Sequence, residues 1–304
     1  MNYPVLLLFF ILMGGSATQR CFAQAKNKIT SLTETEFRTI GKIPPILKEA
    51  SGLYIDKDGF LWSHNDDRLP VLYCFDTLGN VIKAIHLNHN NIGWEAITTD
   101  SLGNIYIGAI GNNKNDRKYL TIIKIKPLHT ISEKITQGEL IRFSYANQTD
   151  FPPTPDKKNY DSDALIFNQG FLYIFTKNRT NPNTGFTRIY QVSPEPGTHK
   201  AMLVDSIFTG KGSLTESWIT DAALSPDKKM LALLGHDKIW LITNFKNHLF
   251  SKGNIEILQL PHFTHKAGIA FRDNTLLYVV DEKEFDILGG NIYRLDIKPR
   301  PEKK

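Results

Sequence analysis

Four acidic residues stand at corresponding points of a segment that recurs along the chain, each at the start of a short apolar stretch: Glu49, Glu95, Asp163 and Asp221. Carboxylates gathered around one axis repel one another unless a cation or a basic group lies among them. Oxygen-rich ligand sets suit Ca²⁺, whereas Zn²⁺ prefers His and Cys. The four acids are therefore predicted metal ligands, with Ca²⁺ as the predicted ion.

A second polar set follows the next apolar stretch of each copy: His64, Asn65, Asp66, Asn112, Asn113, Lys177, Asn178, Arg179, His236, Asp237, Asp281 and Glu282. Within it, His64 and His236 are predicted acid/base residues, because a His beside an Asp from another segment can transfer protons near neutral pH. Trp94 and Trp218 precede acidic positions and would stack on a sugar. The full set of predicted ligand-binding residues is Asn65, Asp66, Trp94, Asn112, Asn113, Lys177, Arg179 and Trp218.

A purely structural alternative explains the same residues. In it, the acids accept hydrogen bonds from backbone amides of neighbouring segments, and the basic residues balance their charge: Lys177, Arg179 and Lys266. Trp94 and Trp218 would then pack in the core or at its rim. Both interpretations are compatible with the sequence.

The elements that position these residues are five copies of one layout, which begin at Glu49, Trp94, Ser162, Thr220 and Lys266. Each copy has an apolar strand, a turn and a more strongly apolar strand. Further strand-like stretches follow, such as VLYCF and VIKAIHL after the first copy. Four short antiparallel strands per copy are typical of a β-propeller blade. A two-layer β-sandwich does not explain five copies of one motif.

The fifth copy has one further strand, NIYRLDIK, before the chain ends, so its outer strand is missing. We expect residues 36–43 (EFRTIGKI), which precede the first copy, to supply it and close the ring without free sheet edges. The prediction is an all-β propeller of five four-stranded blades; the alternative is six, with an extra blade in residues 148–160.

Antiparallel pairing brings the two polar sets together. The start of the first strand in each copy lies beside the end of the second, so both sets fall on one face of the propeller. That face, at the mouth of the central channel, is the predicted working surface.

The first residues predict an export signal. An apolar run at residues 5–13 is too short to span a bilayer comfortably, and small residues suitable for cleavage follow it. The predicted organisation is a signal peptide over 1–23, one propeller domain over 24–298 and a basic tail over 299–304; a membrane anchor or a lipid on Cys21 is the alternative. Cleavage would leave Cys74 as the only cysteine, so we expect a structural thiol and no disulfide.

Composition narrows the class of protein. The chain has 304 residues, of which 41% are hydrophobic and 22% charged, as in a globular protein. Its net charge of +5 is spread along the sequence and gives no basic footprint for nucleic acid. No later segment is apolar enough to cross a membrane. We expect a secreted or periplasmic monomer.

Several strand ends resemble those of secreted bacterial propellers: EASGL from Glu49, SHND from Ser63, GWEAI from Gly93 and GAIGNN from Gly108. Those proteins are similar to the gluconolactonase/NHL-repeat group and to phytase-like propellers. The resemblance implies the propeller fold over most of the chain, and implies no single activity. The chain departs from that pattern at Ala109 and Asn112, where Asp is usual. The fifth copy opens with Lys266, where an acidic residue would complete the acidic set.

Two functions follow. The first is an exported binding module that recognises a glycan, a peptide or a surface component. The alternative is a Ca²⁺-dependent hydrolase of a lactone, ester or phosphoester, in which the metal polarises the substrate. The incomplete acidic set and the lack of a nucleophile motif favour binding.

Overall fold

The computed structural model describes residues 28–284 and 287–297, and these form an all-β propeller. The predicted signal peptide and the predicted basic tail lie outside the described residues. Helical structure in the described part is limited to one short α-helix and three 3₁₀ turns: α1 (Leu214–Ser217), η1 (Leu128–Thr130), η2 (Pro155–Lys157) and η3 (Phe250–Lys252). None of its helices is long and apolar enough to cross a membrane.

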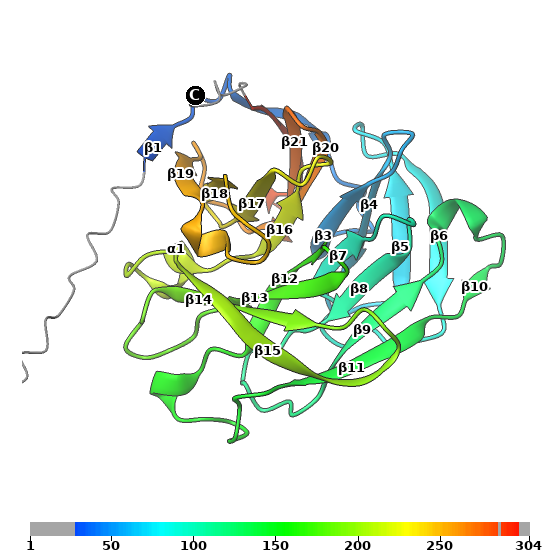
Figure 1. Ribbon diagram of the computed structural model, residues 1–304. Coiled ribbons are helices and arrows are strands. Elements are labelled where there is room, and N and C mark those ends of the chain that lie inside the picture. The colour runs from blue at the N-terminus through cyan, green and yellow to red at the C-terminus, as the bar shows by residue number, and fades with distance from the viewer. Residues whose placement is uncertain (1–27, 285–286, 298–304) are drawn as a thin grey trace, which may run out of the picture.

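Most strands fall into sets of four neighbouring antiparallel strands, as the repeat predicted (Figure 1). The first set is β3 (Ala50–Ile55), β4 (Leu61–Asn65), β5 (Val71–Phe75) and β6 (Val81–Leu87). The second is β7 (Ala96–Thr99), β8 (Ile105–Ala109), β9 (Leu120–Ile125) and β11 (Glu139–Tyr145). The third is β12 (Asp161–Asn168), β13 (Phe171–Lys177), β14 (Phe186–Val192) and β15 (Gly197–Phe208). The fourth is β16 (Asp221–Leu224), β17 (Met230–Leu234), β18 (Lys238–Thr243) and β19 (Asn254–Gln259).

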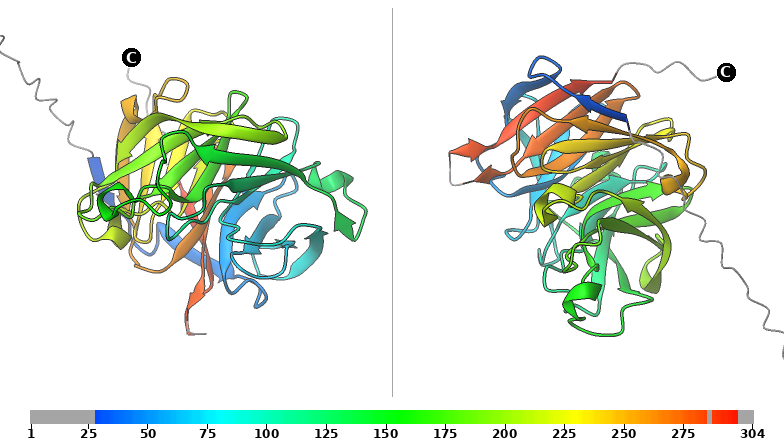
Figure 2. Two further views of the ribbon diagram at one scale, coloured as in Figure 1. Left: turned by 90° about the horizontal axis from the view of Figure 1, so that it is seen from below. Right: turned by 90° about the vertical axis from the view of Figure 1, so that its left-hand side faces the viewer.

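The last set is built from both ends of the chain. It comprises β20 (Lys266–Asp273), β21 (Leu276–Asp281), β24 (Asn291–Asp296) and, at its outer edge, β2 (Phe37–Lys42). Phe37 of β2 is opposite Leu295 of β24, and Lys42 is opposite Asn291. Figure 2 shows this blue strand beside the red ones. The predicted pairing of residues 36–43 with the last copy is therefore confirmed.

Additional pairings extend the sets in ways the repeat did not predict. The short strands β1 (Lys28–Ser31) and β10 (Ile135–Thr136) add in parallel to β19 and β6. Parallel pairing of β11 with β15 joins the second and third sets into one eight-stranded sheet. A small hairpin, β22 (Lys283–Glu284) with β23 (Leu288–Gly289), extends from the last set.

The first strands of the sets contact one another in a closed circle, in the order β3, β7, β12, β16, β20 and back to β3. Apolar clusters fill the space between neighbouring sets. One holds Trp62 and Ile107, from the first and second sets, and another holds Leu234 and Leu277, from the fourth and fifth. These contacts are compatible with the five blades predicted from the five sequence copies. The number of blades stays a prediction. The alternative location of a sixth blade, residues 148–160, contains η2 and no strand.

Three of these inner strands carry a bulge near the same end. The register shifts between Ser51 and Tyr54 in β3, at Asp163 in β12, and at Ala267 in β20. Gly52 has a φ of 67°, a conformation that glycine adopts readily. A bulge adds one residue to a strand and redirects its side chain, and bulges are common beside functional sites. Cys74 lies buried as a free thiol among the described residues, and burial raises its pKa to about 12. Cys21 lies outside the described residues.

Candidate functional site

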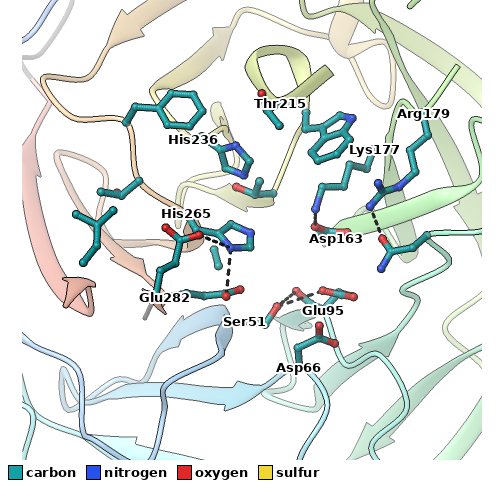
Figure 3. A pocket seen from close by; sticks show the side chains of 18 residues that line it. Ser51, Asp66, Glu95, Asp163, Lys177, Arg179, Thr215, His236, His265 and Glu282 are labelled. Carbon is teal, nitrogen blue, oxygen red and sulfur yellow. Dashed lines mark hydrogen bonds and ion pairs between the residues drawn. The ribbon is translucent and has the colours of Figure 1, made fainter. Parts of the chain in front are cut away.

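A cavity of about 460 Å³ opens where the first strands begin and the second strands end (Figure 3). Eight of the fourteen predicted site residues line it: Asp66, Glu95, Asn113, Asp163, Lys177, Arg179, Trp218 and His236. Glu95 directly precedes β7, and Asp66 directly follows β4. Antiparallel pairing brings these positions to one end of the sheets, which is why residues far apart in the chain converge there.

Asp66 and Glu95 lie side by side in the cavity (Figure 3). Burial, followed by the charges of neighbouring carboxylates such as Asp163, raises the pKa of Asp66 to about 7. The same causes, with burial again the largest, hold the pKa of Glu95 well above its usual value. The Ser51 hydroxyl donates to the Glu95 carboxylate at 3.5 Å, and Asp66 Oδ1 is buried without a partner. The two carboxyl groups therefore retain protons at a pH where exposed acids have lost them.

Lys177 occupies the position beside Asp163 where a cation is needed. The bulge in β12 directs Asp163 to the end of β13, where the Lys177 ammonium forms a buried ion pair with it. Burial lowers the pKa of Lys177, but the charges of Asp163, Asp161 and Glu95 outweigh burial and raise it. Burial, the largest cause, raises the pKa of Asp163, while the charge and hydrogen bond of Lys177 oppose this shift.

Arg179 and Trp218 form the adjoining wall. The Arg179 guanidinium pairs with the buried Asp161 carboxylate and donates to the Asn113 side chain. Its Cζ lies 4.5 Å from the centre of the Trp218 ring, within range of a cation–π contact. Trp218 follows α1, whose first turn is fixed by a capping box between Ser213 and Glu216, and its indole N–H donates to the Asn178 carbonyl at 2.6 Å.

His236 lies two residues beyond β17 and is only 7% exposed. Neither ring nitrogen has a protein partner with the distance and angle of a hydrogen bond, although the Thr215 backbone lies near the ring. Burial, with nearby cationic groups, lowers its pKa to about 3, so the imidazole is neutral at physiological pH. Its ring centre lies 5.5 Å from that of Phe263 and 5.1 Å from that of His265.

His265 was not among the predicted site residues, yet it lines the cavity with Glu282. Its Nδ1 lies 3.2 Å from a Glu282 carboxylate oxygen, and Glu284 is 4.0 Å away. Burial lowers the pKa of His265, but the hydrogen bond and charge of Glu282 outweigh this and raise it. His265 lies in the connection before β20, outside the repeat; Glu282 belonged to the predicted second polar set.

Two of the four predicted metal ligands do not reach the cavity. Glu49 lies on the surface, where Arg68 pairs with both of its carboxylate oxygens at 2.8 Å. Asp221 is fully buried and accepts from the backbone N–H of Ala222 at 2.8 Å and of Ile269 in β20 at 2.7 Å. Asp221 thus makes the backbone contacts that the structural alternative described.

The four acids therefore do not converge on one point. In the described residues, no group of three or more His, Cys, Asp or Glu side chains is arranged to hold a metal ion. Since Ca²⁺ takes six to eight oxygen ligands, Glu95 and Asp163 alone do not complete the predicted four-residue site. Binding of Ca²⁺ stays a prediction for experiment.

The other predicted residues outside the cavity have structural contacts. His64 is fully buried, and its ring packs edge-on against Trp94, 5.5 Å away. Asn65 accepts from the Glu49 backbone N–H and donates to the Ile46 carbonyl. Asn112 donates to the Tyr160 carbonyl and, through its backbone N–H, to Asp161. These contacts join neighbouring segments of the chain.

No protein-family model matches the chain. No curated protein matches it in sequence. Among solved structures, a streptogramin B lyase is 17% identical with a TM-score of 0.38, over 87% of this chain and 74% of the other. The PQQ-bound aldose sugar dehydrogenase from Streptomyces coelicolor is 12% identical with a TM-score of 0.49, over 86% and 97%. The WD40 repeats of RRP9 are 10% identical with a TM-score of 0.48, over 88% and 99%. At these identities and TM-scores the likenesses assign no activity to this chain.

Proposed function

We propose that the protein is an exported β-propeller that binds a small polar ligand in this cavity. One observation carries the proposal: polar atoms on two sides of the cavity are buried without a partner in the protein, namely Asp66 Oδ1 and both ring nitrogens of His236. Buried polar groups are nearly always hydrogen-bonded, because leaving one unsatisfied costs about 1–3 kcal/mol. A bound ligand would satisfy them.

The walls favour a ligand with both apolar and polar parts. Trp218 and Phe263 supply aromatic surface, and the carboxyl groups supply acceptors. A glycan, the end of a peptide or another surface component has this combination of groups. The predicted signal at residues 1–23 supports export, secreted or periplasmic, where such ligands occur, and we propose that the mature protein acts as a monomer.

Binding can be tested on the mature chain by calorimetry and thermal shift against sugars, oligosaccharides and short peptides. We expect at least one ligand to raise the melting temperature and to alter Trp fluorescence. The variant Phe263→Ala removes an aromatic side chain at the cavity and should weaken binding. Phe171→Ala is the matched control, because Phe171 is also exposed but lies at the hairpin between β12 and β13. Equal binding by the two variants would contradict the proposed site.

A second function, hydrolysis of a lactone, ester or phosphoester, is favoured by one feature, the adjacent carboxyl groups of Asp66 and Glu95. Such a pair can hold one proton, so that the carboxylate takes a proton from the attacking water while the carboxylic acid protonates the leaving oxygen. Turnover of lactone, aryl-ester or phytate substrates by the wild type, lost in Glu95→Gln, would support it. Absence of turnover over the whole panel would leave binding alone.

The Ca²⁺ prediction needs a separate measurement. If Ca²⁺ is part of the site, chelation should lower the melting temperature and added Ca²⁺ should give heat in calorimetry. An unchanged melting temperature together with no heat would exclude both the structural and the catalytic calcium proposals.

A further inference from the structure

We infer that the ligand carries one positive charge, and that its ammonium group binds between Asp66 and Glu95. The inference rests on the proposed function and deepens it by naming the chemical class of the ligand. Its starting point is the distribution of charges around the cavity, where some carboxylates have cationic partners and two have none.

Three acids at or near the cavity are already paired. Asp163 pairs with Lys177, Asp161 with Arg179, and Glu282 with His265. Each of these cationic groups is held by a hydrogen bond or ion pair to its acid. None of them lies within ion-pair distance of Asp66 or Glu95, in the part of the chain that the structure describes. Asp66 and Glu95 are hydrogen-bonded to each other but have no ion-pair partner among these three cationic groups.

The charges around Asp66 and Glu95 show what a cation would relieve. Asp66 faces the carboxylates of Asp67, Asp163 and Glu282, in addition to Glu95. Glu95 faces Asp163, Asp161 and Asp66, with Lys177 opposing them and Arg117 also near. The raised pKa values of the two carboxyls follow from burial and from this repulsion. A cation placed between them would stabilise both carboxylates and so release protons as it binds.

The geometry favours an ammonium group over a metal ion. An ammonium has three N–H donors and needs only acceptors such as these carboxyl oxygens. A divalent metal ion needs more ligands than the two that converge here, and the charge of nearby Lys177 opposes a second positive charge. A neutral ligand would supply no counter-charge to a carboxyl that loses its proton.

His236 is an independent indication that the ligand extends across the cavity. Its ring lines the same cavity, is more than nine-tenths buried and has no partner at either nitrogen. Figure 3 shows His236 on the opposite side from Asp66. A neutral imidazole offers one donor and one acceptor, which suits a hydroxyl or an amide. The ligand is thus an amine with a polar group at a distance, either an amino sugar or the amino terminus of a peptide.

Calorimetry with matched probes tests the inference at pH 7.5. The first pair is glucosamine against glucose, and the second is glycylglycinamide against its N-acetyl form. We expect an amine to bind about tenfold or more tightly than its neutral partner, because hydrogen bonds to charged groups are the stronger ones. The pair that shows this preference identifies the source as sugar or peptide. Titration in phosphate and in Tris should differ in heat by the protons released.

Variants assign the effect to the two carboxyls. Asp66→Asn and Glu95→Gln should each abolish the preference for the amine and the release of protons. Asp58→Asn removes one negative charge in the exposed turn before β4, at the other end of that strand, and should change neither. Equal binding of amine and neutral probes, or no binding of either amine, overturns the inference. Binding of a neutral sugar from the wider panel would still leave the proposed function standing.

Discussion

Two buried histidines illustrate how the surroundings of a side chain decide its role. Burial lowers the pKa of His64 to about 4 and that of His236 to about 3, so both rings are neutral near pH 7. His64 lies within β4 and faces the apolar cluster that contains Trp94, whereas His236 lies beyond the end of β17 and lines the cavity. Strand β4 therefore constrains the direction of the His64 ring, whereas no strand constrains that of His236.

Replacing each histidine by phenylalanine should separate these roles. His236→Phe removes both hydrogen-bonding nitrogens from the cavity wall, so we expect about tenfold or weaker ligand binding. His64→Phe keeps a ring of similar shape in the core and should leave ligand binding unchanged. Calorimetry with the best ligand from the panel measures both. Weaker binding in His64→Phe alone would restore the original prediction that His64 acts in the site.

The ion pair between Lys177 and Asp163 should matter more for folding than a surface pair does. Lys177→Met leaves the buried Asp163 carboxylate without its counter-charge, and we expect a loss of about 3–5 kcal/mol in unfolding free energy. Adding Asp163→Leu removes that charge and should recover much of the loss. Urea unfolding of the two single variants and the double variant gives the coupling energy.

The exposed pair between Arg68 and Glu49 is the matched control. Arg68→Met should cost less than about 1 kcal/mol, because the pair is solvated. Equal losses in Arg68→Met and Lys177→Met would mean that solvent screens the Lys177 pair as it does the surface pair.

At the scale of elements, β2 completes the last set and covers the outer edge of β24. The ring of Phe37 stacks on that of Tyr293 with centres 4.5 Å apart, and Phe37 is 1% exposed. Phe37→Ala should therefore lower the unfolding free energy by about 3–5 kcal/mol. Ile29→Ala in β1, where the side chain is 67% exposed, should change it by less than about 0.5 kcal/mol. Denaturant unfolding of both variants checks this; a small loss in Phe37→Ala would show that closure contributes little to stability.

The strand layout could be predicted from sequence because alternation and turns are local signals. The second strand of each copy is strongly apolar or aromatic. The fifth copy lacks an outer strand in sequence, which predicted that residues 36–43 would supply it. The parallel pairing of β1 with β19 could not be predicted from a local sequence pattern, because it depends on which strand edges remain exposed after folding. Pairing of β11 with β15 is equally non-local.

The site could be predicted only to the level of a shared face. Antiparallel pairing placed Asp66, Glu95 and Lys177 together, as expected. Residues at corresponding positions of two copies do not point in the same direction. Asp163 lies at a bulge in β12, whereas Asp221 begins β16 and its carboxylate accepts from backbone amides. A bulge shifts side-chain direction by one residue, and a local repeat does not reveal it. His265 was missed because its connection carries no repeat.

At the scale of the whole molecule, two sets of buried groups oppose each other as the pH changes. The pKa of Asp66 is about 7 in the folded state against 3.8 for an exposed Asp, so the folded state holds a proton between pH 4 and 7 that the unfolded state has lost. Stability from this group therefore rises as the pH falls through 7 towards 4. The raised pKa of Glu95 acts in the same direction.

His64 and His236 act in the opposite direction. Their folded pKa values of about 4 and about 3 lie below the ordinary value of 6.5, so the unfolded state takes up protons first. Stability from these groups is complete above pH 6.5 and is lost as the pH falls towards 4 and 3. The carboxyls and the imidazoles thus act against each other between pH 6.5 and 4.5, and the buried Asp163 and Asp221, whose pKa values burial raises, act on the side of the carboxyls.

Single substitutions should change the dependence of the unfolding free energy on pH in opposite directions. Asp66→Asn removes the gain from the carboxyl, so the variant should lose stability relative to the wild type as the pH falls from 7 to 4.5, and should be the more stable of the two at pH 8. His64→Phe removes one loss, so it should gain stability relative to the wild type over the same fall in pH. Since one pKa unit corresponds to about 1.4 kcal/mol, each change should reach about 1–3 kcal/mol. Urea unfolding at four pH values measures it, and changes of the same sign would show that other groups control the proton balance of folding.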